Sequence, residues 1–432
     1  MWVFPLIFFV CCIIRETAKI LQIKTLRIIH VVGYMFAFTY GLIPAYFIYD
    51  KECYNYKHVF LEDMDYWFIW FVLGVIMYLV IQLVYYVNNH IVFIHRQHEN
   101  TIFKATQISA VLALIIGAYS LMLWTRAYGG LGNAILIADL VRSQESNIFN
   151  PYAFMVHVAN ILIPSTLFFV YACKKKQLLL LNILCVCIAM PLSVGLLIAQ
   201  DGRLSMVLFV ILIVLMAMNA SEHGAMSKKK LLMMGATCIA GLVTIQYINS
   251  WTAYLRTGIE YDATEYLGNE SFVDVEFSHI LRGGIYSVKQ FWEDGSPFLI
   301  WQDIKAALFA WIPSRWKPDD IVYIWEYNTT QLMHGAASGT QPTDMVTTAI
   351  YDMGIGGPII SGIFWGGITR YIDRLLGGAN GIWIIVYYFL INRFIYLVMY
   401  CELYSFVLGL FSIVLWGCIY MGVKLCLRIM PS

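Results

Sequence analysis

The chain has 432 residues, of which 60% are hydrophobic and only 13% are charged, and its net charge is +1. Soluble domains carry about 25% charged residues, and a single soluble core stops growing near ~250–300 residues. This much apolar surface therefore excludes an ordinary soluble protein, and the balanced charge gives no indication of nucleic-acid binding. Aromatic residues make up 16%, which suits the Trp and Tyr belts of a helical membrane protein.

The first apolar stretch, Met1 to Ile14, is followed by four basic residues: Arg15, Lys19, Lys24 and Arg27. A cleaved signal peptide has its basic residues before the apolar core and a small-residue cleavage site after it. Because this order is reversed, we expect an uncleaved first span whose N-terminus lies outside.

About eleven windows are apolar over the ~20 residues that a helix needs to cross the hydrocarbon core, although the first and the seventh are short. The predicted spans cover residues 1–14, 27–48, 66–87, 103–124, 152–172, 178–199, 204–219, 231–249, 346–368, 380–398 and 405–423. The chain is accordingly divided into spans 1 to 8 over residues 1–249, a large outer loop with short helices over 250–345, and spans 9 to 11 with a cytoplasmic C-terminus over 346–432.

Lys and Arg in the short loops set the orientation, because cytoplasmic loops carry an excess of both. With the N-terminus outside, every short inner loop holds at least two of them: Arg15, Lys19, Lys24 and Arg27; Arg96 and Lys104; Lys174 to Lys176; Lys228 to Lys230; Arg370 and Arg374; Lys424 and Arg428. The opposite orientation would place all of these residues outside, so we reject it.

The large loop is rich in aromatic residues and contains little low-complexity sequence, so it is not a linker. Within it, Asp303 to Trp311 has helical spacing with a modest apolar face, as expected of a helix lying in the outer membrane interface. Farther along, the glycines between Tyr351 and Gly367 predict a span that packs closely on a neighbouring helix, because small residues let helices approach.

Several basic residues fall on the outer side, where the orientation rule disfavours them. Arginine binds phosphate oxygens in bidentate fashion and stays charged, so this group predicts a site for a lipid-linked diphosphate; pairing with headgroups or carboxylates is the alternative. Arg393, the only charge that we place clearly inside a span, lies where a charge costs at least ~2.5–3.5 kcal/mol and usually marks function. Arg203 lies in a very short turn. The predicted diphosphate-binding residues are Arg126, Arg203, Arg256, Arg282, Arg315, Lys317 and Arg393.

Arg315 and Lys317 lie between Pro313 and Pro318 in the run Ile-Pro-Ser-Arg-Trp-Lys-Pro. Proline fixes its own φ angle and stiffens such a turn, so we expect both cations to be held in place. An ordinary aromatic-belt turn is the alternative interpretation.

His334 is the predicted general base, because a histidine beside a diphosphate can take a proton from a sugar hydroxyl; a structural histidine is the alternative. The competing bases are Asp201, Asp274, Glu276 and Asp344. No CxxC pair and no Cys/His cluster of zinc type is present, so we expect no metal and no cofactor. Cys53 and Cys401 are the only cysteines predicted outside and could form one disulfide.

Taken together, these motifs resemble those of the bacterial O-antigen polymerases, also called oligosaccharide repeat-unit polymerases. The resemblance covers roughly residues 120–420. It is carried by Gly202-Arg203, by Tyr-Leu-Arg at Arg256 and Leu-Arg at Arg282, by Phe-Ala-Trp-Ile-Pro-Ser-Arg-Trp-Lys-Pro at 309–318, by His334 with Ser338-Gly339 and Pro342-Thr343, by Tyr351 with Gly354 and Gly357, and by Asn392-Arg393. The spacing between Arg256 or Arg282 and the next glycine departs from the arginine-to-glycine spacing of some members.

The resemblance implies an all-α polytopic, GT-C-like fold and a metal-independent glycosyltransferase at the periplasmic face of the bacterial inner membrane. A growing glycan would move from undecaprenyl diphosphate to the next undecaprenyl-diphosphate-linked repeat unit. The catalytic residues would be His334, Arg203 and Arg282, and Arg315 and Lys317 would gate or orient the substrate. The expected partners are the lipid-linked oligosaccharides, membrane lipids and a chain-length regulator protein.

Two rival functions stay open at this point. An O-antigen ligase shares the architecture but passes the glycan to the lipid A core. A lipid-linked oligosaccharide flippase or other transporter is expected to show paired halves and charged residues in a central cavity, whereas one loop dominates this chain.

Overall fold

The computed structural model of the chain is helical, and the residues that it describes contain no strand. The described residues are 1–49, 65–87, 99–138, 148–176, 178–200, 203–219, 226–237, 240–241, 272–333, 341–376 and 382–429. The chain divides into two compact units. Unit 1 consists of Met1–Ile94, Glu270–Gly378 and Arg393–Gly409, and unit 2 of His95–Asn269, Ala379–Asn392 and Leu410–Ser432.

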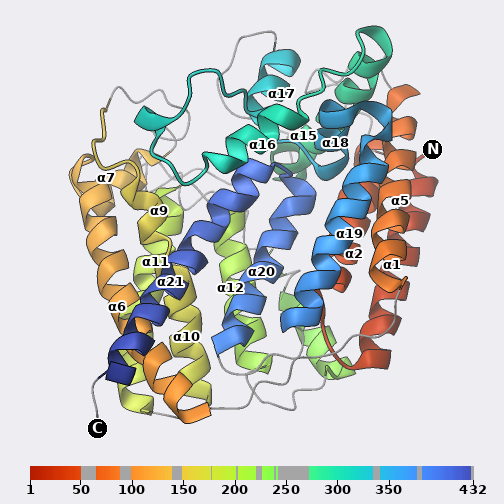
Figure 1. The fold of residues 1–432 in the computed structure, drawn as a ribbon. Helices are drawn as coiled ribbons and strands as arrows, with labels where there is room; N and C mark the ends of the chain where they lie inside the picture. Colours follow the sequence, from red (N-terminus) through yellow and green to blue (C-terminus); the bar gives the residue numbers. More distant parts are fainter. Residues whose placement is uncertain are drawn as a thin grey trace. The chain divides into compact units, whose positions relative to one another are not determined.

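Unit 1 combines the N-terminal helices with the segment that follows residue 270 (Figure 1). Its elements are α1 (Val3–Ile23), α2 (Ile28–Ala37), the π-helix η1 (Phe38–Leu42), α3 (Ile43–Tyr49), α5 (Asp65–Tyr86), α15 (Phe272–Glu293), α16 (Ile300–Leu308), the 3₁₀ helix η3 (Ser314–Trp316), α17 (Ile324–Met333), α18 (Met345–Met353), the 3₁₀ helix η4 (Gly354–Gly356) and α19 (Gly357–Leu376). The unit also includes the last turns of α20 (Ile382–Met399) and the first of α21 (Leu403–Ile429).

Helix α19 packs along α5 through two glycines. A Cβ atom on Gly362 would lie 3.2 Å from the carbonyl oxygen of Met77, and one on Gly366 would lie 3.0 Å from that of Ile81. A larger residue at either position would push the two backbones apart, so the prediction of close packing through small residues is confirmed for these two glycines.

The predicted span 346–368 is wrong as a continuous helix. Helix α18 ends at Met353, and Gly354 has a positive φ of 70°, a conformation that glycine adopts readily. The chain then makes the short turn η4 before α19 begins. The segment 250–345 contains the expected short helices α16, η3 and α17, and in addition the 22-residue helix α15, which packs against α5.

Unit 2 is built from long apolar helices and from the short helices α7 and α9. They are α6 (Glu99–Arg126), α7 (Leu131–Leu136), α9 (Met155–Ala159), α10 (Leu162–Lys174), α11 (Leu179–Ala199) and α12 (Arg203–Asn219), together with the remaining parts of α20 and α21. Thr166 of α10 and Ser193 of α11 share a buried hydrogen bond of 3.0 Å, so the α10–α11 pair is joined by polar contacts as well as by apolar packing.

Within the described residues, six helices are long and apolar enough to cross a membrane. They span Ile28–Tyr49, Asp65–Tyr86, Phe103–Arg126, Met155–Lys174, Leu179–Ala199 and Leu403–Arg428, and each overlaps a predicted window; Ser205–Ala217 and Trp383–Met399 are shorter apolar helices. The described part of the chain is therefore that of a helical membrane protein. Most of the predicted span 231–249 lies outside the described residues.

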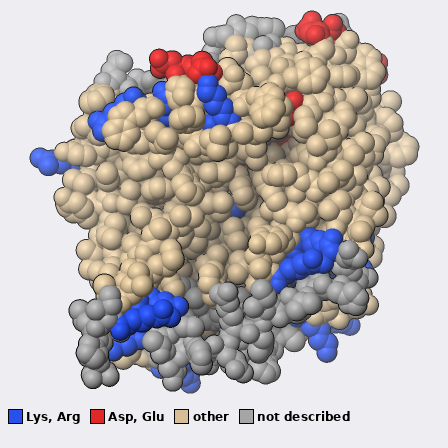
Figure 2. Space-filling view, in the orientation of Figure 1, with Lys and Arg blue, Asp and Glu red and all other residues tan. Residues whose placement is uncertain are grey.

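Helix α1 does not end where the apolar stretch ends. It continues to Ile23, so Arg15 and Lys19 lie inside the helix rather than in the loop where we expected them. In unit 1 the N-terminal end of α1 lies at the same end as α16, α17 and α18 (Figure 1). Basic side chains gather in separate patches toward the two ends of the molecule (Figure 2). Arg370 and Arg374 lie in the last two turns of α19.

Candidate functional site

The structure describes only some of the predicted site residues. Arg256 and His334 lie outside the described residues, as does the side chain of Arg203, whose backbone begins α12. Arg126 is exposed at the end of α6 in unit 2. Unit 1 contains the other four: Arg282, Arg315, Lys317 and Arg393.

Arg393 lies near the C-terminal end of α20, against a glycine of α21. A Cβ atom built on Gly409 would lie 2.8 Å from the guanidinium carbon of Arg393 and 3.0 Å from its Cδ. The same guanidinium carbon lies 5.8 Å from the ring centroid of Tyr396, one turn along α20. Gly409 therefore provides the space in which the arginine side chain lies between the two helices.

Arg282 lies on α15, on the same side as His279 and Tyr286, which are three residues before it and four residues after it. The ring of His279 stacks on Tyr400 at a centroid distance of 5.4 Å, and Tyr400 in turn lies 6.0 Å from Tyr396. This aromatic row connects the turn of α15 that carries Arg282 with the turn of α20 that carries Arg393.

The Arg282 guanidinium has no hydrogen-bond or ion-pair partner within the described part of the chain, although the residue is half-buried. Its burial lowers the pKa of Arg282 below the ordinary arginine value. A partly desolvated guanidinium without a counter-charge is stabilised by an anion, and its planar fork suits two oxygens of a phosphate.

Lys317 lies at the end of the proline-bracketed turn. Its Nζ donates hydrogen bonds to the hydroxyls of Tyr404 (3.2 Å) and Tyr323 (3.4 Å), and it lies 4.6 Å from the ring centroid of Tyr404. Arg315 is exposed and lies over the ring of Trp316, 4.6 Å from its centroid. Of the two predicted cations, Lys317 is the one held by other segments of the fold.

Asp344, which we considered as a competing base, caps a helix. Its carboxylate accepts hydrogen bonds from the backbone N–H groups of Val346 (2.9 Å) and Thr347 (3.2 Å) at the start of α18, and from the Tyr40 hydroxyl (2.7 Å). Burial raises the pKa of Asp344 despite these bonds. A fully buried carboxyl with its acceptor positions occupied is a structural group rather than a base for a sugar hydroxyl.

Two acids that sequence reasoning missed meet where α20 ends and α21 begins: Glu402 lies between these helices, and Asp303 reaches the start of α21 from α16. Both carboxylate oxygens of Asp303, on α16, accept from the backbone N–H of Leu403 at 3.2 Å, and Glu402 accepts from the Ser405 hydroxyl at 3.0 Å. Burial raises the pKa of Asp303 to about 6, and burial together with the neighbouring Asp303 charge raises that of Glu402 to about 8. Asp303 thus caps a helix distant in sequence, a role that its local pattern could not reveal.

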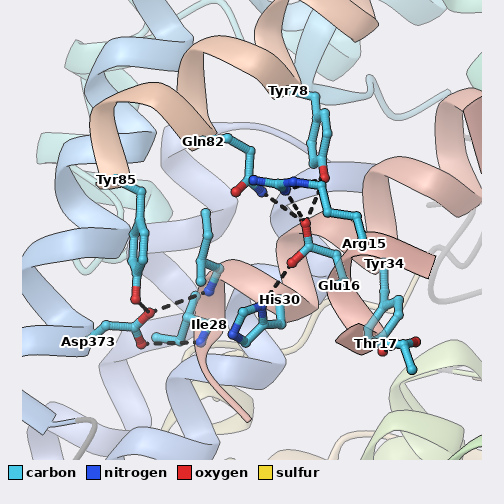
Figure 3. A network of polar contacts seen from close by, with 11 residues as sticks. Arg15, Glu16, Thr17, Ile28, His30, Tyr34, Tyr78, Gln82, Tyr85 and Asp373 are labelled. Atoms are coloured by element: carbon cyan, nitrogen blue, oxygen red, sulfur yellow. Dashed lines mark hydrogen bonds and ion pairs between the residues drawn. The ribbon is translucent and has the colours of Figure 1, made fainter. Parts of the chain in front are cut away.

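A second polar network, also missed, centres on Glu16 of α1 (Figure 3). The Glu16 side chain is fully buried, and its carboxylate accepts from Arg15 Nη1 (2.5 Å), the Tyr78 hydroxyl (2.6 Å) and Gln82 Nε2 (3.3 Å) on one oxygen; His30 Nδ1 lies 2.8 Å from the other. Arg393 is therefore not the only charge inside a long helix of this chain.

The Glu16 network joins three helices. His30 lies on α2, Tyr78 and Gln82 lie on α5, and a Cβ atom on Gly33 of α2 would lie 2.6 Å from Glu16 Cγ. The signal in the sequence was the adjacent Arg-Glu pair within a helical window, which we had assigned to a loop.

Beside this network, Asp373 of α19 accepts hydrogen bonds from the first backbone N–H groups of α2, those of Ile28 (3.1 Å) and Ile29 (3.4 Å), and from the Tyr85 hydroxyl (2.9 Å) (Figure 3). These bonds satisfy N–H groups that the helix cannot pair internally. The carboxylate therefore ties the start of α2 to α19 and α5.

Among the described residues, no three His, Cys, Asp or Glu side chains are grouped so that they could hold a metal ion. Cys401 is buried and carries a free thiol, and Cys53, the partner considered for it above, lies outside the described residues. Comparisons of the chain with protein-family models, with curated proteins and with solved structures found no match.

Proposed function

We propose that the protein is a membrane glycosyltransferase that polymerises lipid-linked oligosaccharide repeat units. The growing glycan moves from undecaprenyl diphosphate to the next undecaprenyl-diphosphate-linked unit at the periplasmic face of the bacterial inner membrane. The observation that carries this proposal is the half-buried Arg282, which has no counter-charge in the described part of the chain and is connected by His279, Tyr400 and Tyr396 to Arg393.

The chemistry of the reaction explains why arginines and aromatic rings would be needed together. The bond between the anomeric carbon of the donor glycan and a diphosphate oxygen breaks, and a bond forms between that carbon and a hydroxyl oxygen of the acceptor unit. The hydroxyl proton passes to a base, for which His334 is our candidate, and undecaprenyl diphosphate leaves with its additional negative charge.

Fixed cations beside the leaving diphosphate stabilise the transition state more than the ground state, since the negative charge grows as the bond breaks. Arg282 and Arg393 would supply these cations from unit 1, and Arg203 and Arg256 remain proposed contributors. The eleven crossings and the GT-C-like fold belong to the same proposal.

The direct test uses purified protein in nanodiscs with a labelled lipid-linked repeat unit and no energy source. A ladder of lengthened products is expected, and Arg282→Gln should reduce the lengthening rate by about 10²-fold, the usual effect of removing one stabilising donor. Lys305→Gln is the control, because Lys305 is a basic residue of the same segment that already pairs with Asp320. Absence of lengthening by the wild type, or an unaffected Arg282→Gln variant, would contradict the proposal.

One observation favours a transport function as the second candidate. Ionisable residues buried in membrane helices mark ion pathways as well as catalytic sites, and the Glu16 network contains both charges and a buried histidine. A flippase would move the labelled unit across a vesicle membrane without lengthening it, so the size of the product distinguishes the two functions.

The ligase alternative is distinguished in cells. Deletion of a polymerase gene leaves lipopolysaccharide capped with a single repeat unit, whereas deletion of a ligase gene removes all capping. The first outcome is the one we expect.

A further inference from the structure

The turn that carries Lys317 is rigid. Pro313 and Pro318 bracket it, the N–H of Trp316 donates to the carbonyl of Pro313 (2.9 Å), and the N–H of Lys317 donates to that of Ser314 (3.1 Å). Proline restricts the backbone on either side of the 3₁₀ turn. The position of the Lys317 Cα is therefore set by the backbone, so little backbone entropy is lost when Lys317 binds a ligand.

Lys317 lacks an acidic partner among the described residues. The nearby Lys305 pairs with Asp320 at 2.5 Å, so this carboxylate is already engaged. Within the described part of the chain, the hydrogen bonds and ring contacts of Lys317 Nζ are instead those to Tyr323 and Tyr404. Burial lowers the pKa of Lys317, which means that the ammonium has lost hydration without gaining a counter-charge.

The tyrosines around Lys317 extend into a set of half-exposed aromatic rings. Tyr323 and Tyr404 meet edge to face at 4.8 Å, and Tyr323 lies nearly parallel to Trp325 at 6.0 Å with an interplanar angle of 24°. Such rings present an apolar face for the C–H surface of a sugar, and their hydroxyls can donate hydrogen bonds at the edge. We name Lys317, Tyr323, Trp325 and Tyr404 the Lys317 cluster.

We propose that the Lys317 cluster is a recognition site for a carboxylate-bearing sugar of the glycan substrate. The ammonium of Lys317 supplies the counter-charge, the Tyr323 and Tyr404 hydroxyls turn to donate to the carboxylate, and Tyr323 and Trp325 stack on the ring. This substrate class rests on the proposed function, but binding of a free saccharide to the cluster does not require catalysis.

The test measures binding of two probes by saturation-transfer NMR to the full chain in nanodiscs of uncharged phosphatidylcholine. The acidic probe is a trisaccharide of galacturonic acid, and the neutral probe is maltotriose. The acidic probe is expected to bind at least tenfold more tightly, with affinity falling as salt is raised, since the contact is a charge pair in a half-exposed site.

Three variants assign the binding to the cluster. Lys317→Gln should remove the tenfold preference, Tyr404→Phe should weaken it while keeping the ring, and Lys317→Arg should retain it because the charge remains. Lys305→Gln is the matched control and should bind as the wild type does. Thermal unfolding of each variant shows whether the fold is intact. If Lys317→Gln unfolds, Lys317→Arg and Tyr404→Phe still test whether the cluster carries the preference.

Equal binding of the two probes, or a preference that survives in folded Lys317→Gln, would overturn the proposal. A second result would also overturn it. If the protein shows no preference for the acidic trisaccharide but binds phosphatidylglycerol vesicles in a way that depends on Lys317, the Lys317 cluster is a lipid-headgroup site. If the protein fails to lengthen lipid-linked units but the probe preference depends on Lys317, the proposed reaction is wrong and the acidic-sugar site stands.

Discussion

Replacing Glu16 by glutamine tests how the N-terminal helices of unit 1 are held together. The carboxylate is fully buried and interacts with Arg15, His30, Tyr78 and Gln82. A glutamine keeps one acceptor oxygen. Its NH₂ group, however, is a donor and would face either His30 Nδ1 or the Tyr78 hydroxyl, which in the wild type lie against a carboxylate oxygen. Removing one partner of a buried charge pair costs ~3–5 kcal/mol. Because the Arg15 side chain is 37% exposed and can turn to water, we expect the lower value, ~3 kcal/mol.

The assay is equilibrium unfolding of the purified protein in detergent, with the helix content followed by circular dichroism. Asp320→Asn is the matched control, because the Lys305–Asp320 pair has the same 2.5 Å separation as Arg15–Glu16 but an exposed carboxylate. It should leave stability unchanged, since exposed pairs are screened by water. If Glu16→Gln destabilises the protein no more than this control, the network does not join α1, α2 and α5 as we infer.

Three further predictions follow from other contacts. Gly409→Ala should displace the Arg393 guanidinium and lower the rate of glycan lengthening at least tenfold. Gly417→Ala is the control and should leave the rate unchanged, because a Cβ atom there would meet open space. Equal rates for the two variants would argue against the placement of Arg393. The pKa of the Glu402 carboxyl is about 8 in the folded protein and 4.5 in the unfolded chain, so the free energy of unfolding should fall as the pH rises from about 4.5 to 8, by at most ~5 kcal/mol. Glu402→Gln should flatten this dependence in urea unfolding; an unchanged slope would assign it to another group. Asp373→Ala removes the acceptor for the first N–H groups of α2 and should lower the free energy of unfolding by ~1–2 kcal/mol in the same urea assay. A variant as stable as the wild type would refute this role of Asp373.

The long apolar helices were predictable because the bilayer imposes a length and a polarity that can be read in any window of the chain. Each of the six apolar helices overlaps a predicted span. The prediction failed at residues whose local sequence pattern is compatible with two different structures. Arg15 and Lys19 looked like the end of a span, yet α1 continues through them because Glu16 finds donors on α2 and α5. Gly354 looked like a packing residue within a span, and it is the turn that divides α18 from α19.

The sequence by itself therefore determined that this is an apolar, all-helical membrane chain, with its basic residues distributed between the two ends of the helices and with cations in the segment after residue 250. The tertiary structure decided which charges meet. Asp303 caps α21 from a hundred residues away, Glu16 gathers donors from three helices, and Lys317 meets Tyr404 rather than an acid. The physical reason is that burial in lipid depends on each residue's own polarity, whereas the partner of a buried charge depends on which helices pack together.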